Sequence, residues 1–161
     1  MKIIFIILLI FSNLYSYDMN KNDLKVDISI GAEKWFLKKD NSTKYGLIYD
    51  MSFNYIIIKN LEIGMYGEIP SIGDGYILGA KINYHYNLTE LSTIYIGMFN
   101  NIHTHNTKYN KDIIENGIDI GGDIKIDVNS YIGIKYKSVL FTNKNEIKRD
   151  YYPQIYFAFY F

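Results

Sequence analysis

The sequence has no cysteine, two prolines and a single tryptophan among its 161 residues, and its 17 basic residues balance its 17 acidic residues. The absence of cysteine excludes a disulfide scaffold, a cysteine-based zinc site and a lipoprotein with an acylated cysteine. Because the net charge is zero, no overall field attracts nucleic acid, and we expect no nucleic-acid partner. Helical periodicity is also missing. The apolar run from Ile3 to Phe11 is much shorter than the roughly 20 residues of a membrane-spanning helix.

The N-terminal segment is typical of a secretory signal peptide. Lys2 supplies a positive charge, Ile3 to Phe11 is apolar, and the small and polar residues that end at Ser16 suit a cleavage site. We therefore predict a signal peptide over residues 1–16 and the export of a mature domain that covers residues 17–161. A single domain fits this length.

Apolar and polar residues alternate along most of the mature chain, which is rich in tyrosine. In the first such segment, Leu24, Val26 and Ile28 alternate with Lys25 and Asp27. A period of two predicts a β-strand with one apolar face. The pattern recurs over residues 45–57, 61–69, 76–86, 93–98, 118–128, 132–140 and 154–161. About eight strands follow from this pattern.

The links between the predicted strands differ in length. Those at residues 38–44, 70–75, 104–112 and 143–150 are mostly long and polar, whereas those near residues 59–60, 87–92 and 129–130 are shorter. In an up-and-down meander the two sets lie at opposite ends. Long loops at one end and short turns at the other are typical of outer-membrane barrels.

Three features predict that the apolar face points outward. The polar face mixes glycines with charges of both signs, as a narrow lumen filled by side chains requires. Strands of about ten residues match a tilted membrane crossing. Aromatic residues recur near strand ends on the apolar face, where rings suit the bilayer interfaces. These are Phe36, Tyr45, Tyr55, Tyr76, Tyr84, Tyr86, Tyr136, Tyr151 and Phe159.

The predicted fold is an all-β, eight-stranded antiparallel up-and-down transmembrane β-barrel. Unpaired backbone groups in hydrocarbon cost several kcal/mol each, according to transfer measurements, so such a barrel must close. We therefore expect the last strand, residues 151–161, to pair with the first.

The end of the sequence carries a resemblance. Apolar residues occupy alternate positions at Ile155, Phe157 and Phe159 and lead to a terminal Phe161, which resembles the assembly signal of Gram-negative outer-membrane barrels. The mature chain resembles the barrel of the OmpA/OmpX type, and the stretch Gly73–Tyr76 resembles YfaZ-type proteins. The resemblance implies a location in the cell outer membrane, contacts with outer-membrane lipid and lipopolysaccharide, recognition by the outer-membrane assembly machinery, and a monomer.

Charged residues on the polar face are expected to point into the lumen. This predicted lumen network comprises Asp27, Glu33, Asp50, Glu68, Lys81, Asp119, Asp123, Lys125, Lys135 and Lys137. Asp123 is expected to lie opposite Lys135 or Lys137. One interpretation is a path for protons or ions. The interpretation that we favour is a salt-bridged plug, because eight strands leave room for packed side chains and not for a water channel.

Other chemistry has weaker support. His103 and His105 would share a face of an extended strand, and with His85 nearby they are weak candidates for a metal site. Two ordinary surface histidines are the simpler interpretation. Ser52, Ser71 and Ser138 have no base close to them in sequence, and so we expect no catalytic residue and no cofactor.

The functional hypothesis is a non-enzymatic outer-membrane protein with a plugged, charged lumen that acts in structure or in surface interaction. Its extracellular ligand would bind the loops at residues 38–44, 70–75, 104–112 and 143–150, which carry a modest excess of lysine and arginine. The alternative is an outer-membrane lipid-modifying enzyme, or a transporter of small molecules or lipids. A soluble ligand-binding barrel is disfavoured, because Gly31 and Trp35 are spaced too widely for the G-x-W pattern of lipocalins.

Overall fold

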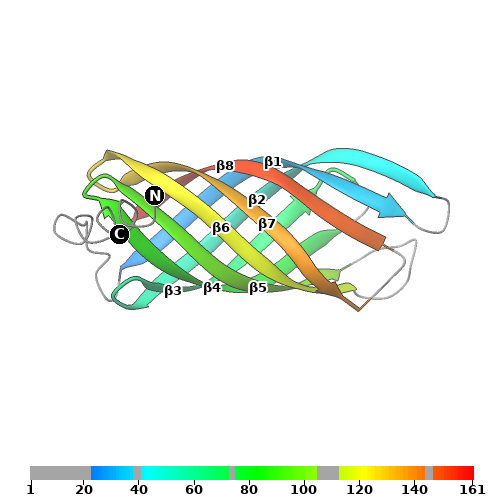
Figure 1. Cartoon of the computed structure of the whole chain (residues 1–161), viewed down its shortest axis with the longest axis horizontal. Coiled ribbons are helices and arrows are strands. Elements are labelled where there is room, and N and C mark those ends of the chain that lie inside the picture. Colours follow the sequence, from blue (N-terminus) through cyan, green and yellow to red (C-terminus); the bar gives the residue numbers. More distant parts are fainter. Residues whose placement is uncertain (1–22, 38–40, 73–74, 105–112, 144–146) are drawn as a thin grey trace, which may run out of the picture.

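The chain forms a closed barrel of eight antiparallel strands (Figure 1). The computed structural model describes residues 23–37, 41–72, 75–104, 113–143 and 147–161. Its strands are β1 (Leu24–Leu37), β2 (Ser42–Ile58), β3 (Leu61–Pro70), β4 (Tyr76–Thr89), β5 (Ser92–Thr104), β6 (Ile113–Asp127), β7 (Ser130–Thr142) and β8 (Ile147–Tyr160). Each strand pairs with the next, so the predicted fold is confirmed. The predicted signal peptide lies outside the described residues.

The barrel closes between its first and last strands, as the sequence predicted. The ladder between β1 and β8 runs from Lys25 opposite Tyr160 to Leu37 opposite Ile147. Two further backbone bonds extend it, because the Leu24 N–H donates to Phe161 (3.2 Å) and the Phe161 N–H donates to Leu24 (2.8 Å). The apolar C-terminal segment is therefore a wall strand. No helix that could cross a bilayer is found in the described part of the chain.

The two ends of the barrel differ as the link lengths predicted. The short turns lie at the end that contains the C-terminus, on the left in Figure 1. One of them, at Asn60, has a φ of 66°, a conformation that asparagine tolerates better than most residues. At the opposite end, called here the loop end, the strands run farther than predicted. Residues 42–44 belong to β2, Pro70 to β3 and residues 147–150 to β8.

A β-bulge in β8 changes which side chains face the interior. Gly31 lies opposite Gln154, but Glu33 lies opposite Tyr151, so β8 has one extra residue in this interval. Pro153, which has no N–H to donate, falls within it. The prediction that Tyr151 lies on the exterior is therefore wrong, since its side chain is 2% exposed and faces inward.

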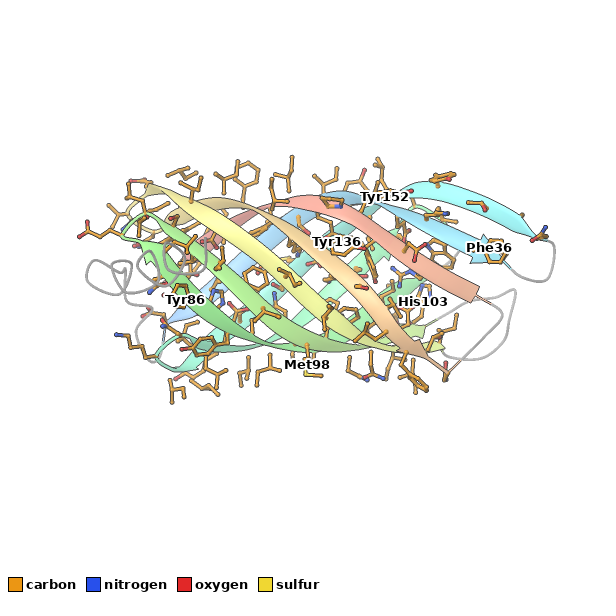
Figure 2. The ribbon with its side chains drawn as sticks, viewed as in Figure 1. Phe36, Tyr86, Met98, His103, Tyr136 and Tyr152 are labelled. Atoms are coloured by element: carbon orange, nitrogen blue, oxygen red, sulfur yellow. The ribbon has the colours of Figure 1, made fainter. Side chains whose placement is uncertain are left out.

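The exterior of the wall is apolar, as predicted. Most outward side chains along every strand are large and hydrophobic, with Met65 72% exposed and Tyr45 67% exposed. Figure 2 shows a fringe of such side chains around the ribbon. Polarity is thus inverted relative to a water-soluble barrel, which keeps its apolar residues inside.

Glycines opposite aromatic rings make room in the interior. Inward rings lie directly across from glycine on the neighbouring strand, in the pairs Tyr66–Gly79, Tyr95–Gly121, Phe99–Gly117 and Tyr156–Gly133. A Cβ atom at Gly121 would lie 2.5 Å from Cε1 of Tyr95. The predicted mixture of small and large residues in the lumen therefore arises from specific cross-strand pairs.

Candidate functional site

The candidate site is the charged interior of the barrel (Figure 2). Of the ten residues of the predicted lumen network, nine are buried, and Lys125 is only half-buried near the end of β6. Among the described residues, the buried basic side chains are Lys25, Lys81, Lys135, Lys137 and Arg149. The buried acidic side chains are Asp27, Glu33, Asp50, Glu62, Glu68, Glu115, Asp119 and Asp123. Inward positions on every strand except β5 contribute to this set.

At the turn end, Glu62 of β3 organises a cluster of hydrogen bonds. Its carboxylate pairs with the ammonium group of Lys25 at 3.2 Å and with Nε2 of His85 at 3.0 Å. The side-chain amide of Asn83 donates to it at 2.9 Å, and Lys81 lies 3.7 Å away. Because Glu62 has several donors, its burial does not depend on one cation.

Three lysines link the acids in the middle of the barrel. Lys81 pairs with Asp27 at 3.3 Å, while Lys135 lies between Asp27 (3.5 Å) and Asp50 (3.1 Å). Lys137 pairs with Asp50 at 2.8 Å and also with Glu68 of β3. The ion pairs thus bridge strands that are distant in sequence and on opposite sides of the interior.

At the loop end, Arg149 of β8 contacts three carboxylates. Its guanidinium lies 2.9 Å from Glu115, 3.1 Å from Glu33 and 3.5 Å from Glu68. It also faces the rings of Tyr151 and Trp35, at 4.6 and 5.2 Å from their centroids. Arg149 was expected in the loop predicted at residues 143–150. That expectation is wrong, because β8 begins at Ile147 and Arg149 points inward.

Buried apolar clusters lie toward both ends of the ion-pair column, the name used here for the buried lysines, Arg149 and their carboxylate partners. Toward the turns, the cluster comprises Ile56, Tyr95, Tyr131, Tyr156, Ala158 and Tyr160. Toward the loops, they are Trp35, Leu37, Ile72 and Ile113. Ile72 comes from the link between β3 and β4, whose neighbour Ser71 bonds to the backbone of Leu47. Charges and rings lie side by side at both ends, since Lys25 is opposite Tyr160 and Arg149 is opposite Trp35.

Two acids have hydroxyl partners. Asp123 accepts hydrogen bonds from Thr93 and from Tyr156, the latter at 2.8 Å. The hydroxyl of Tyr95 lies 3.4 Å from Asp119. The register places Gly133 opposite Asp123, so the expected pairing of Asp123 with Lys135 or Lys137 is wrong. Asp119 lies opposite Lys137 instead.

The histidines do not converge. His103 is buried beneath the loop end, with its ring 5.0 Å from that of Trp35, so it is not the surface residue that was expected. His85 lies toward the turns beside Glu62, and His105 is outside the described residues. Within the described ranges, no group of three metal-binding side chains is found.

The serines that were considered as nucleophiles have structural contacts. The Ser52 hydroxyl accepts hydrogen bonds from Asn54 at 2.9 Å and from Lys81 at 3.1 Å. Ser71 accepts from the Leu47 N–H at 2.7 Å, and Ser138 is half-buried in β7. None of these contacts involves an imidazole that would act as a base.

Four members of the ion-pair column were not predicted from the sequence. Lys25 and Glu62 occupy polar positions of clearly alternating segments, so the period of two was a sufficient signal for both. Glu115 and Arg149 were missed because β6 and β8 begin earlier than predicted. Strict alternation along β8 would also place Arg149 on the outer face, and the bulge at Pro153 turns its side chain inward.

No family model matches the chain, and no curated protein matches it. Among solved structures, it is similar to a designed transmembrane β-barrel, with a TM-score of 0.65, 14% identity, and 89% of this chain and 99% of that chain covered. It is also similar to Neisserial surface protein A, with a TM-score of 0.61, 14% identity, and 86% of this chain and 97% of that chain covered. A third similar structure is Ail, the attachment invasion locus protein of Yersinia pestis, with a TM-score of 0.55, 9% identity, and 88% of this chain and 99% of that chain covered. At the level of fold, the chain is an eight-stranded barrel like these small outer-membrane proteins, which confirms the resemblance to the OmpA/OmpX type.

Proposed function

We propose that this chain is a bacterial outer-membrane barrel that acts without catalysis, as a structural or surface-interaction protein whose loop end carries the interaction site. The observation that carries the proposal is the inverted polarity of the wall. Large apolar side chains face outward along every strand, and the charges are paired inside. An apolar exterior of this extent is stable in lipid and would aggregate in water.

A closed interior is the second part of the proposal. Lys135, Lys137 and Arg149 each touch more than one carboxylate, and buried apolar clusters lie toward both ends of the column. An ion that crossed the barrel would have to displace these buried pairs, and an unpaired buried charge is costly. We therefore expect no steady conductance. The barrel then serves to hold its loop end at the cell surface.

The loops supply the proposed contact. Lys44 is exposed at the loop end, and the links at residues 38–44, 104–112 and 143–150 contain further lysines. Ail, which shares the fold, has been solved in complex with the heparin analogue sucrose octasulfate. Both observations support a polyanion as the ligand, either lipopolysaccharide phosphate or a sulfated host glycan.

The test combines two measurements on the folded protein in lipid. Planar bilayers should show no steady channels, and immobilised heparin should retain the protein in a salt-sensitive manner. The matched variant replaces Lys38, Lys39 and Lys44 with glutamine and should elute at lower salt, while a variant with Lys59 and Lys125 replaced at the turn end should elute as the parent does. Steady ion-selective channels would contradict the closed interior. Equal elution of both variants would contradict the loop-end contact.

A further inference from the structure

A hydrogen-bonded pair of amides interrupts the apolar exterior. Asn100 of β5 and Asn116 of β6 lie directly opposite each other, and the Asn100 Nδ2 donates to the Asn116 Oδ1 at 2.7 Å. Both side chains face outward, because Met98, Ile102 and Ile114, which share their parity along the two strands, are exposed. The pair is therefore part of the surface that the proposed function places against lipid.

Exposed apolar side chains adjoin the amides on the outer face. Asn100 is four residues from the end of β5 at Thr104, and Asn116 is three residues from the start of β6 at Ile113. At about 3.3 Å per residue, the pair lies roughly 10 to 13 Å along the strands from their loop ends. Ile102 and Ile114 fill the interval on the same face. Apolar side chains therefore separate the amides from the strand ends on this face.

The hydrogen bond between the two amides uses only one polar atom of each side chain. Within the described residues, Asn100 Oδ1 and Asn116 Nδ2 have no protein partner. Polar groups without partners are unfavourable in hydrocarbon, where no water compensates them. Acyl chains have neither donors nor acceptors for an amide. The surface at this point is complete only when something polar covers it.

The surroundings of the amides allow close approach. Two adjoining hollows, of about 540 and about 380 Å³, meet at Ala80 and Asn100. Gly67 and Ala80 have little or no side chain, and Met65 projects beside them with 72% of its surface exposed. Small residues that let two walls approach, together with polar residues that bond across them, are typical of contacts between proteins within membranes. Methionine adapts readily to a partner surface.

We propose that a second copy of this chain packs against the patch formed by Met65, Gly67, Ala80, Asn100 and Asn116. Each amide has donors and acceptors, so the patch is complementary to itself, and two copies related by a twofold axis complete each other's hydrogen bonds. This inference rests on the proposed membrane location, and it replaces the expected monomer with a dimer in the membrane plane.

The native chain has no cysteine, which makes single-cysteine cross-linking direct. The variants are Ala80→Cys, within the patch, and Ile30→Cys, a matched outward position on β1, on the other side of the barrel. Each is reconstituted into dilute vesicles and treated with a short bismaleimide. We expect several-fold more cross-linked dimer from Ala80→Cys. Adding Asn100→Leu and Asn116→Leu should reduce it to the level of Ile30→Cys, and adding Met65→Trp, a bulky outward residue, should do the same.

The outcomes separate the two proposals. Flotation with vesicles and faster migration of unboiled samples establish first that every variant is an inserted, folded barrel. Failure of the parent chain to float would refute the membrane location, and the dimer with it. Equal cross-linking at the two positions would refute the dimer alone and would mean that lipid covers the patch. Cross-linking that persists in both the leucine and the tryptophan backgrounds would also refute it.

Discussion

The two ends of the interior bury a cation in different ways. At the turn end, Lys25 pairs with Glu62 and is surrounded by tyrosine rings, with its ammonium 5.7 to 5.8 Å from the centroids of Tyr95, Tyr156 and Tyr160. At the loop end, Arg149 contacts three carboxylates. A lysine ammonium is a compact point charge, whereas the planar guanidinium presents five donors that reach several acceptors at once.

The two ends differ in how many hydrogen-bond partners a buried carboxylate keeps when its cation is removed. Glu62 keeps contacts with His85 and Asn83 when Lys25 is absent. Glu33 and Glu115 converge on Arg149, and without it these carboxylates and Glu68 would be left close together. Glu33 and Glu115 therefore depend on Arg149, while Glu68 also pairs with Lys137. At the turn end, Glu62 is served by several donors.

The largest expected effect follows from removing Arg149. Arg149→Met leaves three buried carboxylates without their shared cation, and we expect it to lower the free energy of unfolding by about 3–5 kcal/mol. Urea unfolding in detergent micelles measures the change. Arg149→Lys is the control. It keeps the positive charge but not the planar guanidinium, and its free energy of unfolding should fall less. An unchanged urea midpoint for Arg149→Met would mean that the three contacts do not stabilise the barrel.

A smaller loss is expected at the turn end. Lys25→Met leaves Glu62 bonded to His85 and Asn83, so the expected loss is about 2 kcal/mol in the same urea experiment. His85→Phe in the Lys25→Met background should add to it. If Lys25→Met proved as damaging as Arg149→Met, the contrast between the two ends would be invalid.

The packing of rings against glycine gives a third prediction. Gly121→Ala would place a Cβ atom 2.5 Å from Cε1 of Tyr95, and overpacking of this kind costs about 1–2 kcal/mol. Gly67→Ala is the matched control, because the nearest atom would be 3.8 Å away. The two variants are compared by the loss of the unboiled, fast-migrating band on heating. Equal melting of both would show that Tyr95 moves aside without cost.

The smallest effect is spectroscopic and concerns the loop end. Trp35 is the only tryptophan of the chain, and its ring is buried in the apolar cluster at the loop end, beside Arg149. Brominated acyl chains should therefore quench its fluorescence only weakly. Tyr49→Trp in a Trp35→Phe background places the ring on the exposed outer wall and should be quenched strongly. Strong quenching of Trp35 itself would place the loop-end cluster outside the barrel.

Strand number, closure and the outward apolar face all followed from alternation in the sequence, because a period of two is a local property of the chain. The pairings inside the barrel did not follow from it. Asp123 bonds to Thr93 and Tyr156 rather than to a lysine, since contacts across the lumen depend on the register of every strand between the partners. The alternation within one strand does not determine how that strand is aligned with its neighbours.

Strand ends were the other source of error. Arg149 was predicted in a loop and Tyr151 on the exterior. Both side chains are buried, because β8 starts earlier than predicted and bulges near Pro153. A proline within an alternating segment was the signal for a bulge, and a bulge changes which side chains face inward. His103 was misplaced for a related reason, since β5 continues to Thr104 and keeps the imidazole beside the loop-end cluster.

The central claim is that the apolar wall meets lipid and the charges stay inside. Flotation of the refolded mature chain with lipid vesicles, followed by gel migration with and without boiling, tests it most directly. The account predicts that the protein floats, resists extraction by urea, and migrates faster unboiled than boiled. A mature chain that stayed monomeric and β-structured in buffer without detergent or lipid would contradict it.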